Sequence, residues 1–157
     1  MKVFITNSQK DLAIDRAQVR NLVLTFFARR KITFSEITVH FVTDKKMRAM
    51  HAEFFDDPSP TDCMTFPVDP IVKGQSDLVL GDIVVCPKTA LVFSEKRGKE
   101  VYQELTLYII HALLHLLGYD DINKKDRSLM RRKEREEMAY LKEVNAWLSP
   151  KETVTRS

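Results

Sequence analysis

The order of apolar and polar residues along the chain predicts short strands that alternate with amphipathic helices. Apolar or alternating stretches of strand length occur four times, at residues 2–6, 37–42, 61–66 and 78–85. Apolar residues recur at helical intervals in five further segments, which begin near Asp15, Asp44, Pro87, Lys99 and Lys125. This order predicts an α+β fold in which a sheet of about four strands packs against helices.

The helical segments turn different residues toward the core. The first is capped by Asp15 and carries an apolar stripe of Val19, Leu22, Val23, Phe26 and Phe27. In the second, capped by Asp44, we expect three inward side chains: Met47, Met50 and Phe54. The last, from about Lys125 to Trp147, places its apolar residues near one face: Leu129, Met130, Met138, Leu141, Val144 and Leu148. Residues 56–60 are expected to form a loop and residues 149–157 a frayed tail.

Composition sets the class of protein. A chain of 157 residues with 44% hydrophobic and 30% charged residues predicts one soluble globular domain over residues 1–157. No apolar run approaches the ~18 residues of a membrane span, so we expect no membrane partner and a cytoplasmic location. Cys63 and Cys86 lack C-x-x-C spacing and are expected to be reduced thiols outside any metal site.

Positive charge gathers near the end of the chain. The net charge is +3, and residues 124–157 hold ten Lys or Arg against six Asp or Glu, a net of +4. Such a segment attracts a phosphate backbone, although a helix rich in Lys, Arg and Glu is more often a solvated face.

The strongest chemical signal is the apolar stretch from Leu105 to Asp121. His111 and His115 are four residues apart there, so both imidazoles lie on one buried helix face and can share a metal ion. Gly118 is expected to end the helix in a left-handed C-cap, which brings Asp120 or Asp121 back to the ion as third ligand. A single histidine on an apolar helix face is usually a core residue bonded to the backbone. Two buried histidines that lack a shared partner would be energetically costly, which favours a metal site.

Three other polar residues draw attention. Glu104 lies on the same helix face as His111, where it is either a partner of a ligand imidazole, a general base for the bound water, or a helix-favouring residue. Asp82 lies in an apolar strand and needs a partner, so it either caps a helix or lines the active cleft. His40 is expected to be structural.

Three stretches resemble the YbeY family, the bacterial metal-dependent endoribonucleases of ribosomal RNA maturation. Residues 111–121, HALLHLLGYDD, are similar to the family pattern H-G-x-L-H-L-x-G-Y-D-H. Residues 60–67, PTDCMTFP, resemble P-T-D-V-L-S-F-P, and residues 80–85, LGDIVV, resemble L-G-D-I-V-I. The resemblance implies single-stranded ribosomal RNA as substrate and a ribosome or ribosomal subunit as partner.

The chain departs from the family pattern at three positions. The third metal ligand of the family is a histidine, and Asp121 stands in its place. An Asn and an Arg of the family are replaced by His51 and Phe55, which removes a cation suited to a scissile phosphate. The resemblance therefore implies the fold and the metal site more firmly than the detail of RNA cleavage.

We therefore predict a single-strand-specific metallo-endoribonuclease with a zincin-like helix carrying HxxxH. His111, His115 and Asp121 are the predicted ligands of one Zn²⁺ ion, and His111, His115 and Glu104 the predicted catalytic residues. The metal-activated water would attack a phosphodiester bond of the RNA. The resemblance implies that this cleavage serves 16S rRNA 3′-end maturation and ribosome quality control. Because a carboxylate replaces a histidine, Mn²⁺ and Fe²⁺ are rivals to Zn²⁺.

Other functions use the same residues differently. In a non-catalytic ribosome-assembly factor, the metal would be structural and the basic last helix would bind RNA. A zincin-type peptide hydrolase is disfavoured by Ala112, which occupies the position of the general-base glutamate of H-E-x-x-H. An iron oxygenase would also use two His and one carboxylate, but such triads usually lie on β scaffolds.

Overall fold

The computed structural model describes residues 1–55, 61–72 and 74–150, so the predicted loop at 56–60 and the tail beyond residue 150 lie outside the described residues. One four-stranded sheet has the order β1-β2-β4-β3. The strands β1 (Lys2–Asn7), β2 (Glu36–Phe41) and β4 (Val79–Val85) are parallel, and β3 (Cys63–Pro67) runs antiparallel to β4. The predicted α+β fold with about four strands is confirmed.

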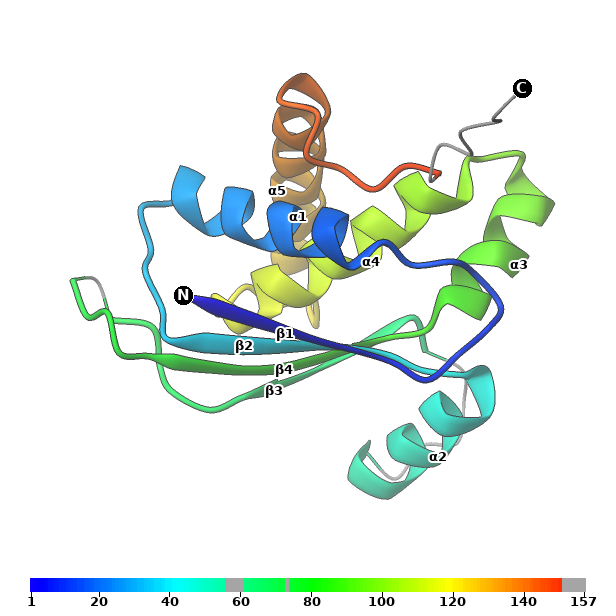
Figure 1. Ribbon diagram of the computed structural model, residues 1–157, viewed down its shortest axis with the longest axis horizontal. Coiled ribbons are helices and arrows are strands. Elements are labelled where there is room, and N and C mark those ends of the chain that lie inside the picture. The colour runs from blue at the N-terminus through cyan, green and yellow to red at the C-terminus, as the bar shows by residue number, and fades with distance from the viewer. Residues whose placement is uncertain (56–60, 73, 151–157) are drawn as a thin grey trace, which may run out of the picture.

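The helices are divided unequally between the two faces of the sheet. Helices α1 (Arg16–Arg29) and α4 (Val101–Leu116) lie over one face, α5 (Lys124–Glu143) rises behind them, and α3 (Pro87–Arg97) stands at one end (Figure 1). The main core fills this layer and includes the predicted stripe of α1, from Val19 to Phe27. Asp15 caps α1 as predicted, because its carboxylate accepts from the N–H groups of Ala17 and Gln18. Of the described helices, none has the length and apolar character needed to cross a bilayer.

Helix α2 (Asp44–Phe55) lies on the opposite side of the sheet and diverges from it toward its C-terminal end (Figure 1). Met47 belongs to a small second core on that side, and Met50 packs against it, as predicted. The prediction that Phe54 points into the core is wrong, because Phe54 is 56% exposed and touches the sheet only at its edge, where its ring lies 5.1 Å from that of Phe66. The cap also differs from the prediction, since the hydroxyl of Thr43 accepts from the N–H of Lys46, and Asp44 is the first residue of the helix.

Gly81 sets the approach of β3 to β4. It pairs with Pro67 and has φ +129°, a conformation that side chains rarely adopt, and a Cβ there would collide with the carbonyl oxygen of Phe66. Glycine at this position therefore lets β3 lie close to β4, in the place where β3 forms one wall of the site described below.

The end of α5 differs from the predicted course. The helix ends at Glu143 rather than near Trp147, so Val144 is exposed. Leu148 still reaches the core from the segment that follows, and its N–H donates to the hydroxyl of Thr106. Ser149, where the frayed tail was expected to begin, is held by a hydrogen bond from its N–H to the Gln18 side chain.

Candidate metal centre

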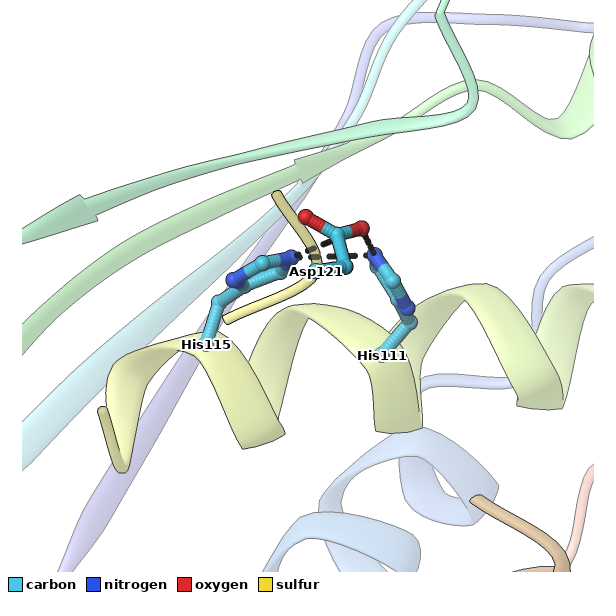
Figure 2. A group of neighbouring side chains, drawn as sticks. All are labelled: His111, His115 and Asp121. Carbon is cyan, nitrogen blue, oxygen red and sulfur yellow. Dashed lines mark hydrogen bonds and ion pairs between the residues drawn. The ribbon is translucent and has the colours of Figure 1, made fainter. Parts of the chain in front are cut away.

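Helix α4 holds the two predicted histidines on one face. Its N-cap is Glu100, whose side chain accepts from the N–H of Gln103, and most of the helix is apolar and buried. His111 and His115 are one turn apart, and their Nε2 atoms are 3.0 Å apart (Figure 2). Both side chains are about three-quarters buried, and both line one cleft.

A tight turn after α4 brings the third side chain back. Gly118 has φ +96°, its N–H donates to the carbonyl of His115, and the N–H of Tyr119 donates to the carbonyl of Leu114. These two bonds form a Schellman motif, in which a left-handed glycine satisfies the last carbonyls of the helix. The predicted left-handed glycine at the helix end is confirmed.

The turn places Asp121, and not Asp120, beside the imidazoles. The Oδ2 atom of Asp121 lies 3.4 Å from Nε2 of His111 and 3.6 Å from Nε2 of His115 (Figure 2). Asp120 is exposed, and its carboxylate accepts from the N–H of Asp121. Of the two carboxylates left open by the sequence, the geometry therefore favours Asp121 as third ligand.

The three donor atoms have the spacing that one divalent ion requires. Ligand bonds of ~2.0–2.1 Å in a tetrahedral zinc site put neighbouring donor atoms roughly 3.3 Å apart. The separations of 3.0, 3.4 and 3.6 Å among His111, His115 and Asp121 bracket that value. Two imidazole nitrogens and one carboxylate oxygen are also ligands that a divalent metal accepts, so the residues fit the predicted ion.

Glu134 of α5 orients His111 from behind. Its Oε1 lies 2.6 Å from Nδ1 of His111, so Nδ1 carries the proton and Nε2 presents its lone pair to the site when the ring is neutral. Burial alone would lower the pKa of His111, but the hydrogen bond and charge of Glu134 outweigh it, and Asp62 and Asp121 add to them. The pKa of His111 is therefore raised.

The role of Glu134 was missed from the sequence, although a signal was present. On α5 the inward positions are Met130, Glu134, Glu137 and Leu141, at helical spacings of four, three and four. Two glutamates on the core-facing stripe of a charged helix are unusual, because buried carboxylates need partners. Glu134 finds His111, and Glu137 finds Arg29 and Arg30.

The ligands open into a cleft of about 460 Å³ between α4 and β3. Segment 61–67 forms one wall, and the Thr65 hydroxyl ties it to α4 by donating to the carbonyl of Ala112. His51 and Phe55 of α2 line the same cleft. Burial, reinforced by Asp62, raises the pKa of the Cys63 thiol well above its usual range. Burial thus disfavours the Cys63 thiolate, and Cys63 is not among the three residues whose ligand atoms lie together.

Glu104 lies in a neighbouring cavity. It is buried and lines a space of about 400 Å³ with Tyr108, Thr61 and Asp62, of which Thr61 and Asp62 also line the metal cleft. Burial raises the pKa of Glu104, while Lys99 opposes the shift. The partner of the His111 imidazole is Glu134 rather than Glu104, and a part for Glu104 in proton transfer stays a prediction.

Asp82 neither caps a helix nor lines the metal cleft, the two roles considered from the sequence. It lies on the outer face of the sheet, away from the metal cleft, and its Oδ1 is 2.8 Å from Nε2 of His40. The other ring nitrogen of His40 is 2.7 Å from the hydroxyl of Thr6. The carboxylate thus has a partner on the neighbouring strand β2, which the apolar pattern of β4 did not reveal.

Comparison with known proteins gives a consistent result. The family model described as Endoribonuclease YbeY matches residues 4–142. Endoribonuclease YbeY of Chlamydia trachomatis serovar D is 37% identical over 150 residues, which cover 95% of this chain and 93% of the relative. That of Chlamydia felis is 38% identical over 152 residues, 95% of this chain and 96% of the relative. The solution structure of a Thermotoga maritima protein shares the fold at 20% identity and a TM-score of 0.59, covering 97% of this chain and all of that one.

Proposed function

Because this chain belongs to the YbeY endoribonuclease family, we propose that it is a metal-dependent endoribonuclease that cleaves single-stranded ribosomal RNA. The finer form of the proposal is that it acts in 16S rRNA 3′-end maturation and ribosome quality control. Its partner would then be the ribosome or a ribosomal subunit, and its location the cytoplasm.

The observation that carries the proposal is the convergence of His111, His115 and Asp121 at an open cleft. A divalent ion held there would lower the pKa of a coordinated water toward ~7 and polarise a phosphoryl oxygen. The chain itself supplies the ligand geometry, since α4 spaces the imidazoles and Glu134 fixes the ring of His111. Glu104 is the proposed proton-transfer residue, because its raised pKa suits exchange nearer neutrality than an ordinary carboxyl allows.

The surface of α5 is suited to a phosphate backbone. Two of its five acidic residues, Glu134 and Glu137, point inward and leave the outer surface more basic than the sequence count indicates. Seven exposed cations lie on α5: Lys124, Lys125, Arg127, Arg131, Arg132, Arg135 and Lys142. Because α5 also contacts His111 through Glu134, these cations belong to an element that borders the metal centre.

We propose Zn²⁺ as the ion, since two imidazoles and one carboxylate with an open position form a known type of catalytic zinc site. The carboxylate makes Mn²⁺ and Fe²⁺ the alternatives. Metal analysis of the protein purified without added metal, followed by reconstitution with each ion, tests the choice.

A second function is favoured by one observation, the presence of Phe55 in the metal cleft. The family places an arginine at this position, so a cation suited to the scissile phosphate is missing. A ribosome-assembly factor would need the metal only for structure and would bind RNA through α5 without cleaving it.

One experiment separates the two functions. Metal-loaded wild type, His115→Ala and the surface control Gln75→Ala are incubated with labelled single-stranded and double-stranded RNA, with and without a chelator. We expect wild type and Gln75→Ala to cut single-stranded RNA, and His115→Ala and chelated samples to be inactive. Equal cleavage by wild type and His115→Ala, or none by any sample, refutes the hydrolase and leaves the binding protein.

A further inference from the structure

Four aromatic side chains form a continuous ridge between α2 and β3. Phe54 and Phe55 are 56% and 51% exposed, and the ring of Phe66 lies 5.1 Å and 6.2 Å from theirs. The ring of His51 lies 5.3 Å from that of Phe55. We call His51, Phe54, Phe55 and Phe66 the aromatic ridge. Exposed rings gathered in this way are costly in water unless a partner covers them.

The ridge separates two clefts. His51 and Phe55 line the metal cleft on one side. Phe54 and Phe66 line a second cleft of about 350 Å³ on the outer face of the sheet, whose floor includes Val84 and whose rim includes Lys46. An RNA strand that leaves the metal cleft across Phe55 would therefore reach the second cleft on the far side of Phe66.

The far end of the second cleft is polar and fixed in orientation. The hydroxyl of Thr6, the imidazole of His40 and the carboxylate of Asp82 form one connected chain across three strands. With Nε2–H donating to Asp82, Nδ1 of His40 accepts from Thr6. Only one oxygen of Asp82 is used by a described residue, and the side chain lines the cleft and is 44% exposed, so its carboxylate can accept a further hydrogen bond from a ligand there.

We propose that the second cleft binds one nucleobase of the single-stranded RNA, next to a base that would stack on Phe55. The inference rests on the proposed function, since it places the rest of the same RNA strand. Aromatic side chains stack bases of any kind, which accounts for Phe54 and Phe66. The cation of Lys46 at the rim suits the adjoining phosphate.

Asp82 would make the second cleft selective. A carboxylate oxygen accepts from an exocyclic amino group, such as that of adenine or cytosine, whereas the N3–H donor of uracil is flanked by two carbonyl oxygens that repel the carboxylate. The second cleft should therefore prefer amino-bearing bases to uracil. If Thr6, His40 and Asp82 serve only to join the strands, no such preference exists.

Binding without catalysis tests the proposal apart from the cleavage activity. Chelator-treated protein is titrated with labelled oligoadenylate and oligouridylate, and fluorescence anisotropy gives the two dissociation constants. We expect tighter binding of oligoadenylate by wild type. Phe54→Ala should weaken it at least about five-fold, the low end for loss of one stacked base. Asp82→Asn should reduce the preference for adenine over uracil, because its amide can present a donor to the base.

Val144→Ala is the matched control, since this exposed apolar residue lies outside both clefts and its loss should change neither constant. An NMR titration of wild type with oligoadenylate gives an answer that needs no variant, because the backbone signals of Thr6, His40 and Phe66 should shift. Unchanged signals, or Phe54→Ala and Asp82→Asn binding like wild type, would overturn the proposal. If the base preference and both variant effects are found but no metal-dependent cleavage is, the endoribonuclease activity is refuted and the proposed base-binding role of the second cleft is kept.

Discussion

Glu134 and His111 join α5 to the metal centre through a contact of 2.6 Å between Oε1 and Nδ1. Both side chains are largely buried, so water competes little for the hydrogen bond. A carboxylate behind a ligand imidazole fixes its tautomer and ring orientation and makes it a stronger donor to the ion. Helix α5 is therefore part of the metal site, although it contributes no ligand.

Glu134→Gln should weaken metal binding by about 10- to 100-fold, the usual effect of losing such a partner. The amide keeps the shape of the side chain but removes the charge that supports Nδ1–H of His111. Competition with a chromogenic chelator measures the affinity. Glu136→Gln is the control, because this more exposed neighbour on α5 pairs with Lys133 and not with the site. Equal affinities of Glu134→Gln and wild type would contradict the proposed orienting role.

The raised pKa of His111 predicts how the stability of the metal-free protein depends on pH. The folded protein holds this proton to a higher pH than the unfolded chain, whose histidines titrate near ~6.5. The stabilisation is therefore complete below that value and is lost as pH rises through the folded pKa. Thermal melts with chelator should show a loss of stability above pH ~6.5 that is absent from His111→Asn. Parallel curves for the two proteins would refute the expected linkage.

Asp121→Ala and Asp120→Ala should differ in metal content. Only Asp121 has an oxygen near both Nε2 atoms, at 3.4 and 3.6 Å, so its removal takes away one of three donors. Asp120 bonds to the backbone of Asp121, and its removal should leave the site loaded. Elemental analysis after dialysis against a dilute chelator gives the occupancy. Full occupancy in Asp121→Ala, or its loss in Asp120→Ala only, would reverse the assignment.

The sequence predicted the parts of the site that lie close together along the chain. His111, His115 and Gly118 lie within two turns of one another, so helical spacing and one left-handed glycine determine where they lie. Glu134 comes from another helix, and nothing local shows which neighbour its carboxylate meets. Asp82 is similar, since its partner His40 is 42 residues away on the adjacent strand.

The fold was likewise predicted where its features are local in the sequence, and not where they depend on contacts between distant segments. Strand and helix periods recovered the elements and the four-stranded sheet, because burial of one face leaves a repeat in the sequence. The predicted burial of Phe54 was wrong, since Phe54 follows the periodicity of α2 but only Phe66 at the sheet edge contacts its ring, and the side chain stays 56% exposed. A repeat shows which side chains share a face, but not whether another element covers it.

Glu137→Ala should destabilise the protein by about 3 kcal/mol, the low end for breaking a buried ion pair, because Arg29 keeps part of its hydration. Glu137 is fully buried and accepts from Arg29 at 2.6 Å and from Arg30 at 2.9 Å, so truncation leaves two guanidinium groups without their anion. Urea unfolding measures the change. Glu143→Ala, at the exposed end of α5, should be neutral. A loss below ~1 kcal/mol in Glu137→Ala would show that the pair contributes little.

Glu104→Gln tests the proposed proton transfer. Burial raises the pKa of Glu104, and its cavity adjoins the metal cleft, because Thr61 and Asp62 line both. Loss of a general acid or base lowers kcat by about 10²- to 10⁴-fold and removes its limb from the pH profile. We expect that result for RNA cleavage, with metal content unchanged and with exposed Glu95→Gln behaving like wild type. Because the amide preserves shape and burial, an unaltered rate and pH profile in Glu104→Gln would assign Glu104 to packing within α4 alone.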